Sequence, residues 1–343
     1  MTKTLYILTL EPVEKRYTKQ WHKHFKKEFS NYFSKVINID GTPQGDEIKK
    51  GRFLDINQTN IWKAEQTIKV AELFAKNKVK DGDIFFFADA WHFGVTAVKY
   101  MSQLNGIKTK LYGYWHAGTY DPNDFVSQAG LGSWAEYNEI GWFRALDASF
   151  VATNAHKELI LESYFGEFKA SKIKVVGFPM DWDAEIRKEI GDYEDIEKEN
   201  IVVFPHRTDP EKNPQDFKAL AKKFPEYKFI ITTDVTKTKK EYYEILAKAK
   251  VVFNNNKQET FGIGTVEAMF LGAMPLVPNR LVFPELYFAQ FVCNNKNHMA
   301  DRLKMFMEKY DTQKLQKPLR GNIEKIKKQS LSAVEKMAQV MLK

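Results

Sequence analysis

Two glutamates, Glu259 and Glu267, stand eight residues apart with Phe261, Gly262 and Gly264 between them. Apolar runs on both sides of this motif are typical of a buried strand, a tight glycine turn and a helix. Glycines at such a turn let the backbone approach a ligand closely, and the start of a helix offers unpaired N–H groups to an anion. A phosphate suits that turn, and the two carboxylates suit hydroxyl groups. Phosphate together with hydroxyls describes a nucleotide sugar.

Two cations, Arg207 and Lys212, follow the apolar run at residues 201–204. Arginine binds phosphate oxygens through two N–H groups at once, and lysine adds a compact charge. A departing nucleoside diphosphate needs such charges as its bond to the sugar breaks. The alternative is that both are ordinary surface cations of a loop, but the glutamate motif further along the chain favours the first interpretation.

Taken together, these residues resemble the donor half of retaining GT-B glycosyltransferases of the family-4 type. Residues 254–262 are similar to that family's S-x-x-E-x-F-G loop, and residues 175–181 look like its interdomain hinge, V-x-G-N-G-V-D. The likeness covers roughly residues 105–280. Its strength lies in the conjunction of the motifs, because each one alone is a weak signal.

The resemblance implies a role for each matched residue. Arg207 and Lys212 would bind the donor diphosphate. Glu259 would contact the sugar hydroxyls, and Glu267 would bind those of the ribose. The backbone N–H groups expected to hold phosphate and sugar are those of Thr260, Phe261, Gly262 and Ile263. For Glu267 the alternative is a first-turn acid favoured by the helix dipole.

The predicted catalytic residues are His116, Arg207, Lys212 and Glu259. His116 ends the strand predicted at residues 110–115, and a glycine follows shortly after it. This arrangement resembles the family's catalytic-loop histidine, which contacts the donor sugar. The alternative is a packed or surface histidine without a role in the chemistry.

Acidic residues after two predicted strands are candidates for the acceptor side. Asp89 follows the strand at residues 84–87, where it could hold the acceptor or cap the helix that comes next. Asp121 and Asp124 lie just beyond His116 and could line the same side.

The segment at residues 9–16 contains no glycine, whereas the family usually has a glycine-rich loop after its first strand. Close backbone approach to a ligand is therefore not expected there. Side chains such as Arg16 or Thr18 would take over that role, or the loop would serve a large acceptor.

A competing metal signal is the D-x-D triplet formed by Asp181 and Asp183. Such a triplet is the manganese signature of the other glycosyltransferase architecture, GT-A, because two carboxylates and a diphosphate satisfy a hard cation. The triplet lies at the predicted hinge, away from Arg207 and Lys212, so we interpret it as part of a linker. No metal and no cofactor are predicted, and the nucleotide sugar is a co-substrate.

Short β-branched or aromatic runs alternate with helical stretches, which predicts βαβ units and parallel sheets. The predicted strands are residues 5–10, 36–39, 84–87, 110–115, 149–152, 173–176, 201–204, 228–232, 251–254 and 274–277. A charged stretch at residues 185–200 interrupts the series and is interpreted as a junction. We expect an α/β protein of the GT-B type, with two doubly wound Rossmann-like domains facing a cleft. The predicted domains are 1–178 for the acceptor, 179–318 for the nucleotide sugar, and a C-terminal helix at 319–343 that packs back on the first.

A formal charge of +8 and an isoelectric point of about 9.1 favour a polyanionic partner, either nucleic acid or an anionic membrane surface. Residues 15–27 are basic with interleaved aromatics, and could follow a phosphate backbone while the aromatics meet a displaced base. The alternative is an amphipathic helix with a solvated basic face. No apolar run is long enough to span a membrane, and the single cysteine, Cys293, fits a reducing cytoplasm.

The resemblance implies transfer from a UDP-sugar to a hydroxyl group with retention, by front-face attack in which the leaving phosphate takes the acceptor proton. One possible acceptor is a 5-hydroxymethylated pyrimidine in DNA, as for phage glycosyltransferases, in which case the protein works in the host cytoplasm. The alternative is a cell-surface or lipid-linked glycan. A third hypothesis is a nucleotide-sugar-binding module without activity, against which the presence of both cations and both glutamates argues.

Overall fold

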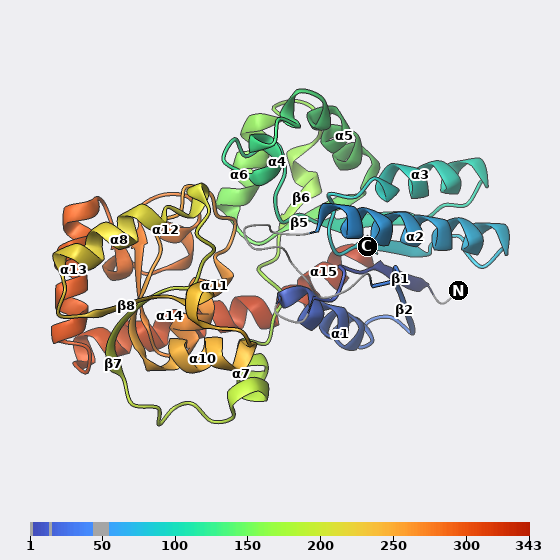
Figure 1. Cartoon of the computed structure of the whole chain (residues 1–343). Helices are drawn as coiled ribbons and strands as arrows, with labels where there is room; N and C mark the ends of the chain where they lie inside the picture. Colours follow the sequence, from blue (N-terminus) through green and yellow to red (C-terminus); the bar gives the residue numbers. More distant parts are fainter. Residues whose placement is uncertain (1–2, 14–15, 44–54) are drawn as a thin grey trace. The chain divides into compact units, whose positions relative to one another are not determined.

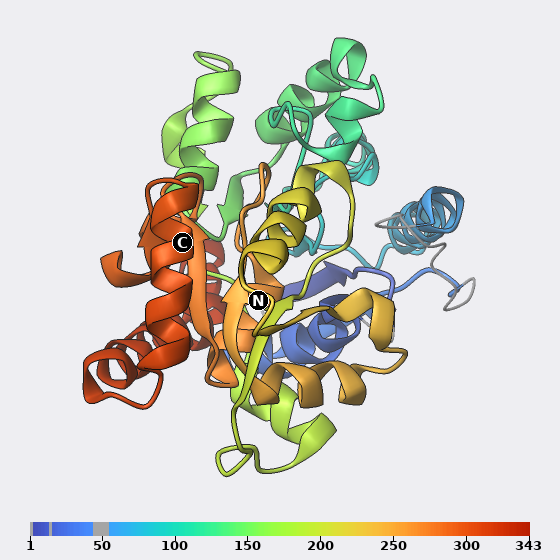
Figure 2. The same cartoon turned by 60° about the vertical axis from the view of Figure 1, so that its left-hand side comes forward.

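The computed structural model describes residues 3–13, 16–43 and 55–343, so Lys15 of the basic segment lies outside the described residues. The chain divides into two compact units. Unit 1 comprises Met1–Met180 and Ser332–Lys343, and unit 2 comprises Asp181–Leu331. Each unit is a parallel β-sheet with helices on both of its faces (Figure 1 and Figure 2).

Unit 1 contains six parallel strands in the order β2-β1-β3-β4-β5-β6. The strands are β1 Thr4–Leu8, β2 Lys35–Ile39, β3 Ile84–Phe87, β4 Lys110–Tyr114, β5 Ala148–Val151 and β6 Ile173–Val175. The helices are α1 Tyr17–Phe29, α2 Ile56–Ala75, α3 Gly94–Leu104, α4 Phe125–Gln128, α5 Gly132–Ala145, α6 Asn154–Ser163 and α15 Ala333–Met341, with a short 3₁₀ turn at Ala170–Lys172. All residues of β3 are apolar and buried, as expected for an inner strand of a sheet covered on both faces.

Unit 2 contains five parallel strands in the order β11-β10-β9-β7-β8. The strands are β7 Glu199–Phe204, β8 Lys228–Ile231, β9 Ala249–Phe253, β10 Met274–Pro278 and β11 Val292–Cys293. The helices are α7 Trp182–Ile190, α8 Pro214–Lys223, α9 Thr232–Val235, α10 Lys239–Lys248, α11 Ile263–Phe270, α12 Phe283–Leu286, α13 Lys296–Glu308 and α14 Gln313–Leu331, with 3₁₀ turns at Pro210–Lys212 and Ala289–Phe291.

The two sheets share one feature of strand order that decides where a ligand can bind. In each unit, the strand that comes first along the chain lies between the second and the third strand. Ligands of such sheets bind beyond the carboxyl ends of the two strands where the order reverses. These strands are β1 and β3 in unit 1, and β7 and β9 in unit 2.

The predicted α/β fold with two doubly wound parallel sheets is confirmed. Each of the ten predicted strands is present, with bounds within two residues of those expected. The structure differs from these predictions at two segments. The charged junction contains α7, because the buried side chains of Trp182 and Ile186 are enough to anchor one short helix. The terminal helix is two helices, since α14 ends at Leu331 in unit 2 and α15 begins at Ala333 in unit 1. None of the helices in the described ranges is both long and apolar enough to cross a membrane.

Candidate functional site

The loop after β7 contains Arg207 and Lys212, and the structure gives them different partners. Arg207 Nη1 lies 2.5 Å from Asp209 Oδ2, and its Nη2 lies 3.1 Å from Glu211 Oε1. Lys212 reaches across to the loop after β9, where its ammonium donates to the carbonyl oxygen of Gln258 at 3.1 Å. The arginine is therefore paired within its own loop, whereas the lysine joins the two loops at the switch point of unit 2.

Glu259 is the acidic partner of Lys212. Its Oε2 lies 3.7 Å from Lys212 Nζ and accepts a hydrogen bond from Asn256 Nδ2 at 3.0 Å. Burial by itself would raise the pKa of the Glu259 carboxyl, but the charge of Lys212 and the hydrogen bonds to the carboxylate hold its pKa below the usual range. The group is therefore ionised at neutral pH and can only accept hydrogen bonds.

Three buried polar atoms around Glu259 have no hydrogen-bond partner among the described residues. They are Nε2 of His206, Oδ1 of Asn256 and the hydroxyl of Tyr287. Burial lowers the pKa of His206 to about 3, so its ring is neutral at physiological pH. The charge of Glu259 acts on both His206 and Tyr287. Because buried polar atoms are normally paired, this cluster indicates a place where a polar ligand would find donors and acceptors.

The glycine turn predicted after β9 is present. Gly262 has a left-handed backbone, with φ 86° and ψ 53°, and is the N-cap residue of α11. Only glycine adopts this conformation at little cost. A Cβ atom at Gly264 would lie 2.8 Å from the carbonyl oxygen of Pro205, so the first turn of α11 packs directly on the loop after β7. The two glycines therefore set the close approach of the two loops.

The four backbone positions predicted to hold phosphate and sugar differ in their surroundings. The N–H groups of Thr260 and Phe261 donate to the carboxylate of Glu259, the first at 3.2 Å. Gly262 and Ile263 begin α11, whose N-terminus has no side-chain cap. An anion at this turn would meet the helix N-terminus, while the two preceding N–H groups hold the glutamate.

Glu267 lies in the second turn of α11, so the first-turn alternative is wrong. Its carboxylate accepts hydrogen bonds from the hydroxyls of Tyr242 at 2.9 Å and Tyr243 at 2.8 Å. Lys239 Nζ lies 3.7 Å from the same group. All three partners belong to α10, and a ribose bound here would share the carboxylate with them.

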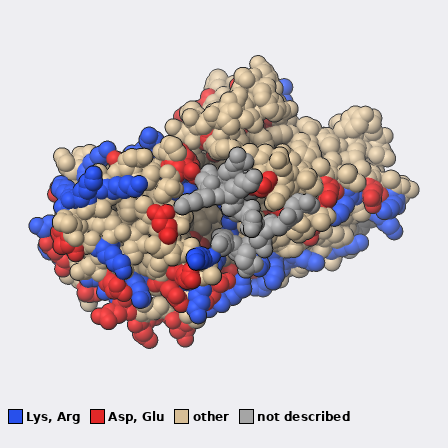
Figure 3. Space-filling view, in the orientation of Figure 1, with Lys and Arg blue, Asp and Glu red and all other residues tan. Residues whose placement is uncertain are grey.

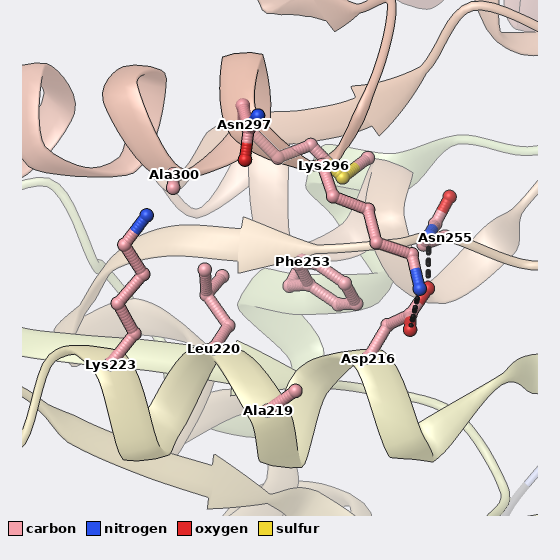
Figure 4. A pocket seen from close by; sticks show the side chains of 10 residues that line it. Asp216, Ala219, Leu220, Lys223, Phe253, Asn255, Lys296, Asn297 and Ala300 are labelled. Carbon is pink, nitrogen blue, oxygen red and sulfur yellow. Dashed lines mark hydrogen bonds and ion pairs between the residues drawn. The ribbon is translucent and has the colours of Figure 1, made fainter.

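Three consecutive asparagines follow β9, and all are buried. Arg280 Nη2 donates to the carbonyl oxygens of Asn255 at 2.8 Å and Asn256 at 3.0 Å. The side chain of Asn255 donates to Asp216, which also accepts from Lys296. Figure 4 shows the last two contacts beside a pocket of about 160 Å³ between α8 and α13. None of the predicted site residues lines this pocket. These contacts therefore hold the asparagine loop in place and are not part of the candidate site.

His116 follows β4 and is oriented by two hydrogen bonds. Its Nε2 lies 2.9 Å from the carbonyl oxygen of Ala88, and its Nδ1 lies 3.2 Å from the hydroxyl of Tyr17. A carbonyl only accepts, so Nε2 carries the proton and Nδ1 accepts from the tyrosine in the neutral ring. The rings of Tyr17, Trp21 and Tyr114 lie 5.6, 5.0 and 5.2 Å from the imidazole centroid. Burial lowers the pKa of His116, which keeps the ring neutral.

Asp89 lies beyond the carboxyl end of β3, at the switch point of unit 1. Its Oδ2 accepts from the buried ammonium of Lys63 at 2.8 Å, and its Oδ1 accepts from the N–H of Trp91 at 3.1 Å. Burial would raise the pKa of Asp89, but the charge of Lys63 and the hydrogen bonds from Lys63 and Trp91 hold it below its usual range. The N-cap residue of α3 is Phe93, so the helix-cap alternative for Asp89 is wrong.

Asp121 and Asp124 shape the loop after His116. Asp121 accepts a hydrogen bond from the N–H of Asn123 at 2.9 Å. Asp124 is the N-cap residue of α4 and accepts from the N–H of Val126 at 3.0 Å. Both side chains are buried, and these backbone contacts give each of them a structural task.

Glu139 of α5 is a buried carboxylate that the motifs do not reveal. It accepts hydrogen bonds from the N–H of Thr119 at 2.7 Å, from Trp91 Nε1 at 2.7 Å and from the hydroxyl of Tyr164 at 2.6 Å. Trp91 follows β3 and Thr119 follows β4, so Glu139 joins the loops at two strand ends. Burial raises the pKa of Glu139. Its signal in the sequence is an acid on the apolar face of an amphipathic helix.

The glycine-free loop after β1 is closed by its own side chains. Thr18 is buried, and its Oγ1 accepts from the N–H of Val13 at 3.1 Å. Arg16 is the N-cap residue of α1 and is partly exposed. Thr18 therefore shapes the loop, and Arg16 is the side chain of the pair that could meet a ligand.

The predicted stacking of the α1 aromatics on a base is wrong for the large side chains. Trp21 and Phe25 are 1% and 2% exposed, because they pack on each other and into unit 1. Lys23, Lys26 and Lys27 are exposed on the opposite side of the helix. The alternative, an amphipathic helix with a solvated basic face, describes α1.

Both carboxylates of the D-x-D triplet make structural contacts within unit 2. Asp181 is the N-cap residue of α7 and accepts from the N–H of Ala184 at 3.2 Å. Asp183 forms an ion pair with Lys327 and accepts from the hydroxyl of Tyr193 at 2.7 Å. Within the described residues no group of three potential metal ligands comes together.

Comparison with known proteins gives partial sequence similarity and extensive fold matches. No protein-family model matches the sequence. The tRNA-queuosine alpha-mannosyltransferase of Drosophila melanogaster is 27% identical over 167 residues. This match covers 39% of the chain and 44% of the relative, so it spans less than half of either protein.

Several solved structures match nearly the whole chain, and two of them serve as examples. The sucrose-phosphate synthase of Thermosynechococcus elongatus has a TM-score of 0.63 at 12% identity, and the match covers 99% of this chain and 97% of that one. The alpha,alpha-trehalose 6-phosphate synthase of Burkholderia multivorans has a TM-score of 0.64 at 9% identity, with coverage of 100% and 98%. These similarities show that the chain has the GT-B glycosyltransferase fold.

Proposed function

We propose that this protein is a glycosyltransferase that moves a sugar from a nucleotide sugar to a hydroxyl group of an acceptor. The observation that carries the proposal is the Lys212–Glu259 pair at the switch point of unit 2, with three unpartnered buried polar atoms around the carboxylate. A UDP-sugar is the first donor to test, because solved structures with this fold include UDP-forming synthases.

In this proposal unit 2 binds the donor. The diphosphate meets Arg207, Lys212 and the N-terminus of α11, where an anion is stabilised by cations and backbone N–H groups. The sugar hydroxyls donate to the ionised carboxylate of Glu259. Arg207 must exchange at least one of its acidic partners, Asp209 or Glu211, for the phosphate. Glu267 binds the ribose together with its tyrosine partners.

The transfer step breaks the bond between the anomeric carbon and the diphosphate oxygen and forms a bond between that carbon and the acceptor oxygen. The acceptor proton goes to the leaving diphosphate. Lys212 and Arg207 stabilise the negative charge that develops on the leaving group. Glu259 contributes by positioning the donor sugar. We further propose retention of configuration, because the ion-paired Glu259 suits the binding of hydroxyls better than attack on carbon.

For the acceptor we propose a modified nucleoside in a nucleic acid, and DNA with 5-hydroxymethylated pyrimidines is the first candidate. The basic charge of the chain favours a polyanion. The partial sequence relative is, by its name, a transferase that acts on queuosine in tRNA, which is a second candidate. A cell-surface or lipid-linked glycan is the alternative that the acceptor screen must include.

The proposal is tested by incubating the purified protein with a panel of UDP- and GDP-sugars and detecting the released nucleoside diphosphate. Acceptors are hydroxymethylated DNA, plain DNA, tRNA and a glycan. The expected result is release that depends on one donor and on a hydroxylated nucleic acid. The anomeric configuration of the product, read by NMR, decides retention, and addition of EDTA decides whether the two cations suffice without a metal ion. Binding of a nucleotide sugar without release under any condition would favour a non-catalytic module.

A further inference from the structure

The edge of the sheet in unit 1 carries a basic groove that no step of the proposed transfer uses. Strand β2 is at the edge of the sheet, and α1 lies beside it. Between them is a groove of about 640 Å³ whose lining includes His22, Lys23, Lys26, Lys27, Asn38 and Asp40. In the space-filling view, lysine and arginine side chains gather along the lower edge of the face shown, in the region of α1 and β2 (Figure 3).

The charges in the groove are almost all positive. Lys23 and Lys26 have no acidic partner among the described residues, and Lys27 meets only the neighbouring Glu28 at 3.4 Å while its side chain is 83% exposed. An exposed pair of this kind is weak. The one acid of the lining, Asp40, is already bound by His22 at 3.0 Å and by the hydroxyl of Thr9. The groove therefore presents three lysines to an anion.

The spacing of the lysines fits a chain of phosphates. Lys23, Lys26 and Lys27 lie three and four residues apart on one side of α1, so they span about 6 Å along the helix axis. Phosphates of one nucleic-acid strand follow at about 3.4 Å along a duplex. The three lysines are therefore close enough together to contact neighbouring phosphates of one strand.

The shape and the buried aromatics favour a nucleic acid over a membrane. A helix that binds a bilayer presents large apolar side chains next to its basic ones. In α1 these side chains, Trp21 and Phe25, are buried in unit 1. What remains outside is a concave surface along the edge of a sheet, lined by the lysines of α1 and by Val36, Ile37 and Asn38 of β2. A concave basic surface fits a flexible polyanion better than a flat bilayer.

We propose that this groove binds the phosphodiester backbone of a nucleic acid. The proposal rests on the proposed function only in taking that nucleic acid as the acceptor, since binding itself requires neither donor nor transfer. The groove contacts the backbone and not the base edges, so it contributes affinity without choosing the sequence.

The test measures binding of labelled single-stranded and duplex DNA and of tRNA by fluorescence polarisation, over a series of salt concentrations without donor. The wild-type affinity should fall log-linearly with salt. In the triple variant Lys23→Ala, Lys26→Ala, Lys27→Ala the slope should become shallower by about 2 to 3, because up to three phosphate contacts are lost. Replacing the same lysines by arginine should preserve the slope, which shows that the charge matters and the fold is intact.

The matched control removes three exposed lysines of unit 2, Lys222, Lys309 and Lys317, which lowers the net charge equally. An equal loss in this control, an unchanged slope in the groove variant, or a wild-type protein that binds anionic vesicles but no nucleic acid would each overturn the proposal. Release of nucleoside diphosphate is measured separately. Nucleic-acid binding without any release would therefore count against the proposed function and leave the groove assignment standing.

Discussion

At the scale of single residues, Glu259 and Glu139 have pKa values that their surroundings shift in opposite directions. Glu259 has a cation and hydrogen-bond donors around it, which lower its pKa and keep it ionised. Glu139 has three hydrogen-bond donors, but burial dominates and raises its pKa. The ionised carboxylate of Glu259 suits the binding of sugar hydroxyls. The buried carboxyl group of Glu139 suits a structural role, in which it holds two loops together. Both pKa shifts can be tested by substitution.

Asn256 orients Glu259, so Asn256→Ala should weaken the binding of the nucleotide sugar about tenfold or more, in line with the loss of a hydrogen bond to a charged group. The lost hydrogen bond also helps to lower the pKa of Glu259. In the variant that pKa should rise toward its usual value, and the acid limb of the binding profile should move to higher pH. Titration calorimetry between pH 4 and 8 measures both effects. Asn297→Ala, at an exposed asparagine of α13, is the matched control, and an equal change there would refute the assignment.

Glu139→Gln should change how stability depends on pH. The folded pKa of Glu139 is raised above its ordinary value of 4.5, so the folded state binds more protons than the unfolded state in the window above that value. Stability of the wild-type protein therefore falls as the pH rises through this window. A glutamine side chain does not ionise, but its carbonyl oxygen can still accept the hydrogen bonds from Thr119 and Trp91.

The predicted result is that Glu139→Gln gains stability relative to the wild type as the pH rises from about 4.5. Urea denaturation of both proteins at several pH values measures the difference. Glu139→Leu removes the acceptors and should be destabilised at every pH tested. A difference between wild type and the glutamine variant that does not vary with pH would be inconsistent with a raised pKa.

At the scale of elements, the periodic patterns of the sequence were enough to predict the sheets. The run of phenylalanines in β3 and the apolar runs of β7 and β9 are unambiguous, and their ends locate Asp89, Arg207 and Glu259. The sequence could not predict α7, because only two buried side chains define it. It also could not show that Glu139 is buried and Asp89 half-buried, since their partners Thr119, Trp91 and Lys63 come from other elements.

The contact between α11 and the loop after β7 depends on Gly264. In Gly264→Ala the new Cβ atom would lie 2.8 Å from the carbonyl oxygen of Pro205, and either the backbone or the helix must move. We expect a loss of about 1–3 kcal/mol of stability, the usual cost of overpacking, together with weaker donor binding. Denaturant unfolding and nucleotide titration measure the two effects.

The control is Gly141→Ala in α5, where no atom lies within 4 Å of the new Cβ atom. Alanine is the better helix former by about 1 kcal/mol, so this variant should be as stable as the wild type or more so. If Gly264→Ala binds the donor as well as Gly141→Ala does, the close packing of the two loops is not important for the site.

At the scale of the whole molecule, the last twelve residues belong to the first unit. Ser332–Lys343 joins unit 1, and α15 contacts α1 there. Met337 and Met341 are fully buried, and burial of such a side chain contributes about 2 kcal/mol or more. The C-terminal helix α15 is therefore part of the hydrophobic core of unit 1.

Deletion of residues 332–343 should lower the melting temperature of unit 1 while unit 2 still binds the nucleotide. Six of the seven tryptophans lie in unit 1, with Trp182 as the exception, so tryptophan fluorescence reports mainly on unit 1. The control is a deletion of Leu342 and Lys343 alone, which are exposed. Equal melting temperatures for the two deletions would show that α15 does not stabilise unit 1.

The central claim is that the two cations after β7 stabilise a departing nucleoside diphosphate. The most direct measurement is the turnover of Arg207→Ala and Lys212→Ala with the best donor and acceptor pair, beside Lys222→Ala as a control at an exposed lysine of the same unit. We predict that turnover falls about a hundredfold or more in the first two variants, with the fold intact by circular dichroism and the control unchanged. Near-normal turnover in both Arg207→Ala and Lys212→Ala would contradict it.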